Sequence, residues 1–283
     1  MKKKDIKSNI EHRIKRAGES FRKLHSDFDS KAIHDFRVEI KKIRALIRLA
    51  AFATKQEKKL KLPKKLKRFY RAVGGIRSCQ LHARKISETA SRGKKPPPDI
   101  YLKLLDGRKE VMIRQAKREK RQLNGIKKEM EKLIRQMPRA MDSDSTKNFI
   151  YFELSRLNEI HSKRNPNDLE LHEVRKILKD ILYNWSFLEP GLISILPTSI
   201  QKKKEMEELV NRLGKHQDHL VSLHIFNDLG IDQDADEQER SDLKKIALKW
   251  KGEKAHLRKE ILATLKRISL NGHPGYLPVS ETP

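Results

Sequence analysis

The stretch HDFRVEIKKIRALIR, residues 34–48, decides how this chain folds and where its charge lies. Successive residues of an α-helix are rotated by about 100°, so side chains three or four positions apart share one face, and the basic side chains of this stretch fall within an arc of roughly 80°. They are His34, Arg37, Lys41, Arg44 and Arg48. The opposite face is apolar, with Phe36, Ile40 and Ile47. The pattern predicts a helix that packs one side into a core and presents a row of positive charge on the other.

The same order of residues returns in the second half of the chain. His172, Arg175 and Lys179 repeat the spacing of the first motif, 138 residues further on. A glycine follows each motif, Gly74 after the first and Gly214 after the second, and these two lie 140 residues apart. Segments that repeat at a nearly constant offset indicate a duplicated unit.

Helical periodicity extends over most of the sequence and predicts an all-α fold. Helices are expected over residues 5–26, 30–53, 56–90, 99–137, 145–163, 168–188 and 199–228, and after residue 232 as far as 270, before an irregular tail. Antiparallel packing of four helices would bury the apolar faces of each half. We therefore expect two four-helix bundles related by internal duplication, the first over residues 1–138 and the second over residues 139–283.

The charge of the chain is large and unevenly distributed. Of 283 residues, 65 are lysine or arginine and 38 are aspartate or glutamate, which gives a formal net charge of +27. Residues 1–138 hold 42 basic and 15 acidic residues, whereas residues 139–283 hold 23 of each. Charge of this size repels itself and destabilises the compact state. A polyanionic partner of the first half would explain it, and the alternative is a surface that serves solubility alone.

Several classes of protein do not fit this composition. No apolar run approaches the roughly 20 residues needed to span a bilayer. The basic N-terminus is not followed by an apolar segment, so it does not predict a secretory signal. Cys79 is the single cysteine, so no intramolecular disulfide is expected. The expected location is the reducing cytoplasm.

The basic rows point to a ligand made of phosphates. Arginine grips phosphate oxygens with a planar fork, lysine supplies a compact charge, and histidine titrates near neutrality. Binders of single-stranded nucleic acid usually add aromatic stacking platforms, and here Tyr70 and Tyr183 are the nearest candidates. The candidate binding residues are His34, Arg37, Lys41, Arg44, Arg48, Lys64, Lys67, Arg68, Arg71, His172, Arg175, Lys179 and Lys204. For either histidine the alternative is a core residue bonded to a neighbour.

The sequence predicts no catalytic residue, no metal site and no cofactor. His216, His219 and His224 lack the spacing of a tight ligand set, and no cysteine or paired carboxylate completes one. Neither a glycine-rich phosphate loop nor a Ser/His/Asp arrangement is present.

These motifs resemble the CHAD family, the conserved histidine α-helical domains. HDFRVEIKKIRALIRL is similar to the signature helix of the family, and LHEVRKILKDILYNW to its second copy. VGGIRS and LGKHQD resemble the paired Leu-Gly-x-x-x-Asp segments. The resemblance implies two four-helix bundles around a pseudo-two-fold axis and a basic groove between them that binds inorganic polyphosphate. The matched residues are His34, Arg37, Lys41, Arg44, His172, Arg175, Lys179 and Tyr183.

The sequence departs from the family pattern mainly in its second half. Leu182 stands where a basic residue is usual, and Ser78 in the first half replaces the usual aspartate, which Asp218 keeps in the second. Unequal contributions of the two halves are therefore expected. The expected function is noncatalytic binding of polyphosphate, or of another linear polyanion, with recruitment to polyphosphate granules. The alternatives are a protein that binds nucleic-acid backbone and an enzyme on phosphorylated substrates with the histidines as acid/base groups.

Overall fold

The protein is all-α, as predicted. The computed structural model describes residues 5–24, 28–53, 60–163, 165–196, 200–230 and 236–268, and within these ranges the chain forms helices and no strand. Several predicted boundaries lie outside the described residues: the helix ends at residues 26 and 270, the helix starts at residues 56 and 199, and the irregular tail.

The helices of the first half are α1 (Ile6–Arg22), α2 (Ser30–Ala51), α3 (Lys64–Arg92), α4 (Asp99–Arg121) and α5 (Ile126–Gln136). Those of the second half are α6 (Ser143–His161), α7 (Asp168–Tyr183), α8 (Trp185–Ile195), α9 (Lys203–Leu229) and α10 (Glu237–Arg267). Both basic motifs lie on helices, the first on α2 and the second on α7.

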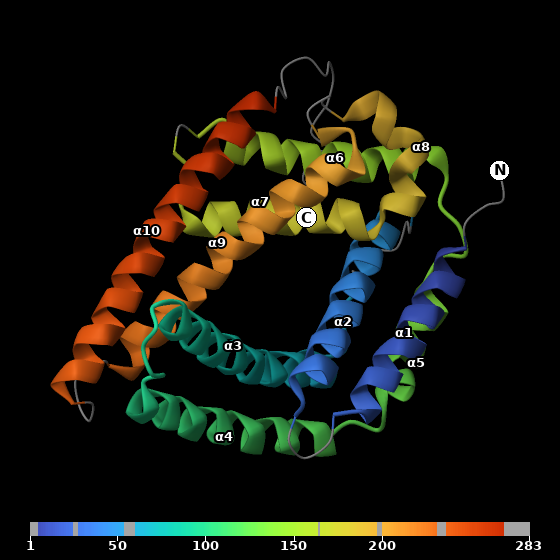
Figure 1. Ribbon diagram of the computed structural model, residues 1–283. Helices are drawn as coiled ribbons and strands as arrows, with labels where there is room; N and C mark the ends of the chain where they lie inside the picture. The colour runs from blue at the N-terminus through green and yellow to red at the C-terminus, as the bar shows by residue number, and fades with distance from the viewer. Residues whose placement is uncertain are drawn as a thin grey trace.

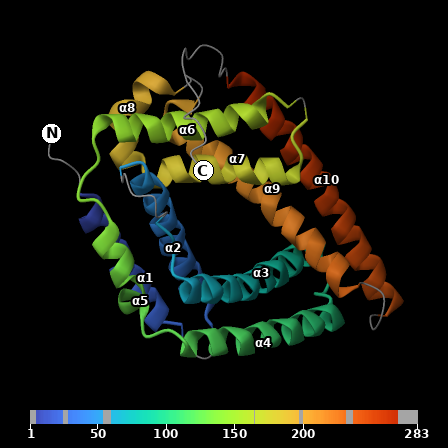
Figure 2. The ribbon, with the colours of Figure 1, turned by 180° about the vertical axis from the view of Figure 1, so that it is seen from behind.

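Four inner helices form a closed ring, and four outer helices surround it (Figures 1 and 2). Around the ring, α2 contacts α3, α3 contacts α9, α9 contacts α7, and α7 contacts α2. On the outside, α1 packs on α2, α4 on α3, α6 on α7 and α10 on α9. Each inner helix therefore has one side against an outer helix and another side free to face the centre of the ring.

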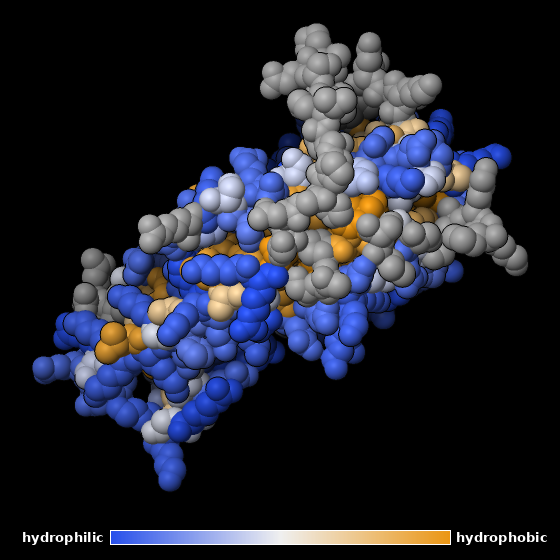
Figure 3. All heavy atoms as spheres, turned by 90° about the horizontal axis from the view of Figure 1, so that it is seen from above, coloured by the Kyte–Doolittle hydropathy of each residue, from blue (hydrophilic) through white to orange (hydrophobic). Residues whose placement is uncertain are grey.

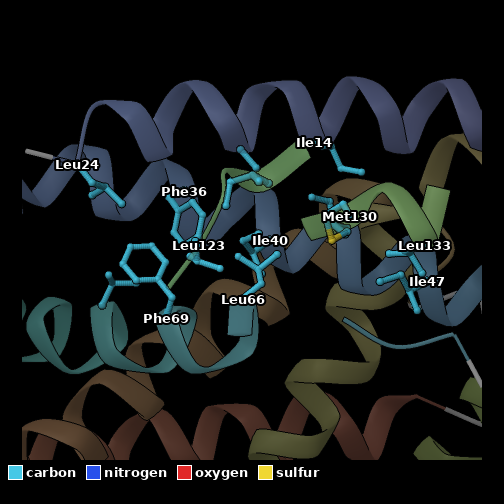
Figure 4. Close-up of a cluster of buried hydrophobic side chains, with 14 of the residues drawn as sticks. Ile14, Leu24, Phe36, Ile40, Ile47, Leu66, Phe69, Leu123, Met130 and Leu133 are labelled. Atoms are coloured by element: carbon cyan, nitrogen blue, oxygen red, sulfur yellow. The ribbon is translucent and has the colours of Figure 1, made fainter. Parts of the chain in front are cut away.

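The apolar faces are buried in two large clusters. One is built from residues between 6 and 137, and the other from residues between 149 and 268 together with Leu49. In the first cluster Phe36 and Phe69 are fully buried, with ring centroids 5.4 Å apart (Figure 4). Burying one such side chain contributes about 1.5–3 kcal/mol, so this contact fixes α2 on α3. The division of the chain into two repeats between residues 138 and 139 stays a prediction.

Several helices differ from the prediction, including the one expected over residues 168–188, which is divided at Asn184 into α7 and α8. The helix expected over residues 99–137 is interrupted, because Gly125 adopts a φ of 93°, a left-handed conformation that favours glycine, and α5 begins after it. A break was expected at Pro190 and Gly191, yet α8 runs through both positions. Leu188, Leu192 and Ile195 recur at helical spacing and are buried in the second cluster, so their burial outweighs the missing donor of the proline.

The described residues contain no helix that is both long and apolar enough to cross a membrane. The face of the molecule shown in Figure 3 is mostly hydrophilic, with hydrophobic side chains confined largely to a band across its middle.

Candidate functional site

A groove of about 720 Å³ lies at the centre of the helix ring. Its walls come from α2, α3, α7 and α9, so all four inner helices contribute. Among the described residues, eleven lysines and arginines but three carboxylates line it. The cations are Arg37, Lys41, Arg44, Arg48, Arg77, Arg84, Lys85, Arg175, Lys176, Lys179 and Lys215, and the carboxylates are Glu88, Asp180 and Asp218. Both motif histidines, His34 and His172, also line the groove. The fold thus brings the two basic rows to one cavity.

The row on α2 is set by how this helix begins and packs. The Asp29 carboxylate caps the helix by accepting a hydrogen bond from the Ala32 backbone N–H at 2.8 Å. The apolar side is buried in the first cluster. His34 is exposed, and Arg37 and Arg44 are half-buried at the groove. The predicted row of charge therefore faces the ring centre.

Arg37 is held in place by α3. Its guanidinium donates to the Tyr70 carbonyl oxygen at 3.0 Å and lies over the Tyr70 ring, 4.5 Å from the centroid. Gly74 provides the space, because a Cβ atom there would lie 3.2 Å from Arg37 Cζ and still closer to one of its nitrogens. Arg44 also lies over this ring, at 5.9 Å. The tyrosine thus serves as a support for arginines.

The row on α7 is built in a similar way. Asn167 and Glu170 form a capping box at the helix start, which satisfies its first backbone donors. Arg175 passes close to Gly214 of α9, where a Cβ atom would lie 3.4 Å from Arg175 Nη2. Lys179 lies 5.3 Å from the centre of the Tyr183 ring. In both halves an arginine three residues after the histidine therefore packs on a glycine of the facing helix.

Several groove residues on α3 and α9, among them Arg77, Lys85 and His219, were not predicted to bind the ligand. Arg77 hydrogen-bonds to Ser30 Oγ. Lys85 Nζ lies 2.7 Å from His219 Nδ1 and 4.3 Å from the centre of the Trp250 ring. Residues 74, 77, 81 and 85 follow helical spacing from the glycine, so this spacing was the signal that could have revealed the α3 wall.

Burial, joined at Lys41 by neighbouring cations, lowers the pKa values of lysines in the groove. Burial, followed by Arg37, Arg175 and Lys179, lowers the pKa of Lys41 to about 8. Burial also lowers the pKa of Lys85 to about 8. Such shifts show that the charged forms are destabilised in the free protein. An anion that entered the groove would relieve this.

The pKa values of His34, His172 and Asp218 are also shifted by the surroundings in the groove. Reduced hydration in the groove lowers the pKa of His172 and of His34, although the His34 side chain is exposed; the next cause is Arg77 for His34 and Lys176 for His172. Although its side chain is exposed, Asp218 lies in the wall of the groove, where reduced hydration raises the pKa of its carboxyl.

Arg48 has a partner inside the protein. It forms an ion pair with Asp180 of α7, whose side chain is 7% exposed. Nearby, the Asn184 side-chain amide donates to the Ala45 carbonyl oxygen at 3.0 Å. These contacts tie α2 to the end of α7. Of the predicted groove cations, Arg48 is therefore the one whose charge is already balanced by a buried carboxylate.

Five predicted binding residues do not line the groove: Lys64, Lys67, Arg68, Arg71 and Lys204. All five are exposed. Arg68 instead contacts α4, at 3.1 Å from Glu119 Oε2 and 2.5 Å from Gln122 Oε1. On α3 the groove residues begin at Tyr70. A binding role for these five stays a prediction.

The described residues contain no group of three or more His, Cys, Asp or Glu side chains that could hold a metal ion. His216 lies 3.4 Å from Asp168, and His219 lies 3.5 Å from Glu253. These histidines thus have different partners.

The structure defines a class of helical proteins in which paired helices surround a strongly cationic groove. The family model of the CHAD domain matches residues 10–227, and the chain belongs to this family. The crystal structure of the CHAD domain from the plant Ricinus communis is similar, with a TM-score of 0.61 over 92% of this chain and 89% of that chain. The two are 14% identical, so the likeness concerns the fold. A comparison with curated proteins gives no match.

Proposed function

We propose that this protein binds inorganic polyphosphate in the central groove without catalysing a reaction. The observation that carries the proposal is the set of eleven cations and three carboxylates on four helices around one cavity. The general association of CHAD domains with polyphosphate-related ligands supports it. Arginine and lysine side chains form charge-assisted hydrogen bonds with phosphate oxygens.

The groove suits a chain of phosphates better than a nucleic acid. Two tyrosines, Tyr70 and Tyr183, are its aromatic residues apart from the histidines. Arg37 and Arg44 lie over the first ring, and Lys179 lies beside the second. Because these cations compete with a base for the ring faces, stacking contributes little. Contacts to phosphate then supply most of the affinity, and a chain of phosphates without nucleobases can make all of them.

A noncatalytic role is supported by how the groove carboxylates are engaged. Asp180 pairs with Arg48, and Glu88 lies 3.6 Å from Arg84. Asp218 is surrounded by cations of the groove, with Arg175 and Lys85 the strongest influences on its carboxyl. Among the described residues, no group of three or more His, Cys, Asp or Glu side chains could hold a catalytic metal ion on a phosphate.

Competition between ligands tests the proposal. Fluorescent polyphosphate bound to the full chain should be displaced by unlabelled polyphosphate, and far less by a single-stranded oligonucleotide of equal charge. Affinity should fall on the order of a hundredfold or more between about 50 and 200 mM salt, because several phosphate contacts release counterions. Equal displacement by the oligonucleotide would favour the nucleic-acid alternative, and release of orthophosphate during incubation would favour an enzyme.

We further propose that the protein is cytoplasmic and is recruited to polyphosphate granules. A fluorescent fusion should colocalise with granules in cells that accumulate polyphosphate. The matched control is a fusion in which Arg37 and Arg175 are both replaced by glutamine, since these two arginines occupy equivalent places on the neighbouring helices α2 and α7. Granule localisation of this control would show that recruitment does not use the groove.

A further inference from the structure

Lys41 occupies an unusual place in the groove. It lies on α2 and lines the groove together with Arg37 of its own helix and with Arg175 and Lys179 of α7, and these three cations act on its amine. Asp218 of α9 is the acidic residue that acts on it, and its effect is smaller than that of each of these cations. In the described part of the chain Lys41 forms no ion pair and no hydrogen bond. Its amine is thus surrounded by groups that attract anions.

Such surroundings activate a lysine as a nucleophile. An amine beside other cations and partly removed from water loses its proton more easily. With its pKa lowered to about 8, Lys41 has a far larger unprotonated fraction near neutral pH than an ordinary lysine has. Lys85 has a similar pKa, but its amine lies between His219 and Trp250. Lys41 is therefore the more available nucleophile.

We propose that Lys41 is a modification site that accepts an acyl group from an acyl phosphate bound by the cations around it. The inference rests on the proposed phosphate-binding role of the groove and goes beyond it. An acyl phosphate carries its electrophilic carbon directly on a phosphate. Arg37, Arg175 and Lys179 would hold that phosphate, which brings the carbonyl carbon to the amine of Lys41.

The reaction is an acyl transfer. The amine lone pair attacks the carbonyl carbon and forms the C–N bond. The bond between this carbon and the phosphate oxygen breaks, and inorganic phosphate leaves with that electron pair. The amine loses one proton to solvent, and the product is a neutral amide. Held in contact with the amine, the bound donor reacts faster than the same donor in solution.

Acylation would change what the groove binds. It removes one positive charge from the point where the two basic rows meet. The loss of one charge-assisted contact should weaken the affinity for polyphosphate roughly tenfold. Bound polyphosphate would in turn protect Lys41, because it occupies the cations and favours the protonated amine. Polyanion binding and acylation would then exclude each other.

Mass spectrometry of the full chain incubated with acetyl phosphate at pH 7.5 tests this inference. Acetylation of Lys41 should be at least about tenfold faster than that of Lys64 and Lys67, which are exposed outside the groove. Long-chain polyphosphate should suppress the reaction at Lys41 and leave these two lysines unchanged. With N-hydroxysuccinimidyl acetate, a donor without phosphate, the preference for Lys41 should be smaller. Arg175→Gln should reduce the preference with acetyl phosphate while Lys41 is still present.

The result separates this inference from the proposed function. If polyphosphate binds the unmodified protein but Lys41 is acetylated no faster than Lys64, the modification site is wrong and the binding function stands. If polyphosphate does not bind but acetyl phosphate modifies Lys41 selectively, the groove is a site for small phosphates and the proposed function is wrong. Equal preference with both donors would also overturn the inference, because reactivity alone would then explain the labelling.

Discussion

The α2 and α7 walls of the groove should contribute unequally to polyanion binding. Replacing Arg37, Lys41 and Arg44 by glutamine removes three cations from α2, and replacing Arg175 and Lys179 removes the equivalent pair from α7. We expect the α2 variant to bind polyphosphate much more weakly than the α7 variant.

The magnitude follows from the number of phosphate interactions that each variant removes. Each well-made charge-assisted interaction contributes about 1.5–3 kcal/mol, so three of them amount to about 4.5–9 kcal/mol and two to about 3–6 kcal/mol. The difference, roughly 1.5–3 kcal/mol, corresponds to between about tenfold and 150-fold in affinity. Its source is Arg44, because Leu182 occupies the equivalent position of α7 and packs against the second core cluster. A linear ligand can shift along the groove, which favours the lower end of this range.

Titration with polyphosphate of one chain length at fixed salt measures the difference. The double variant Arg37→Gln and Lys41→Gln is the matched control, since it removes the same number of charges as the α7 variant. Circular dichroism should show unchanged helicity in all three proteins. Equal losses in the triple and the α7 variant would refute the reasoning and show that Arg44 does not bind the ligand. A larger loss in the α7 variant would assign the charge excess of the first half to solubility or to a separate site.

Four other results are expected. The affinity for polyphosphate should fall as pH rises above about 8, because Lys41 and Lys85, whose pKa values are lowered to about 8, must then take up a proton to bind. Below about pH 7 both lysines are already charged, so titrations between pH 7 and 9.5 should show this window. The affinity should also rise as pH falls from 8 to 6 and further below, because the pKa values of His34 and His172 are lowered in the free protein. Replacing both of these histidines by glutamine should remove this rise. Gly74→Ala should weaken binding about tenfold by displacing the arginine that packs on it, whereas Gly214→Ala should have a smaller effect. Asp180→Ala should lower the free energy of unfolding by about 1–3 kcal/mol, less than for a fully buried pair because Arg48 reaches solvent, and should tighten polyphosphate binding because Arg48 becomes available.

The parts of the site that lie on one helix could be predicted from the sequence. The row from His34 to Arg48 has a helical period, so its common face follows from geometry alone. The structure places each of its members in the groove. The ion pair of Arg48 was not predictable, because Asp180 reaches it only through the packing of α7 on α2. Periodicity gives the face of a helix, whereas a partner on another helix depends on the tertiary fold.

The α3 wall likewise shows how far the site can be predicted from the sequence. Lys64, Lys67 and Arg71 are basic and close in sequence to the groove, and they nevertheless lie outside it. Farther along the same helix, Arg77 and Lys85 line it. Which turns of α3 reach the ring centre depends on where it crosses α2, and the contact between Phe36 and Phe69 sets that crossing. The composition of a helix therefore shows that it is basic but not which of its cations share a site.

The cations packed between inner and outer helices form ion pairs with buried carboxylates, whereas most cations in the groove do not. Glu39 of α2 is buried on the side that packs against α1. Its carboxylate oxygens lie 3.3 to 3.5 Å from side-chain nitrogens of Arg13, Arg16 and Lys42. Glu153 is buried behind α7 and accepts a hydrogen bond from Arg156 at 2.6 Å. Charges held between helices must be paired, because an unpaired buried charge is strongly destabilising. The groove cations can stay in excess over carboxylates because water reaches them, and the self-repulsion that results is what a bound polyanion would relieve.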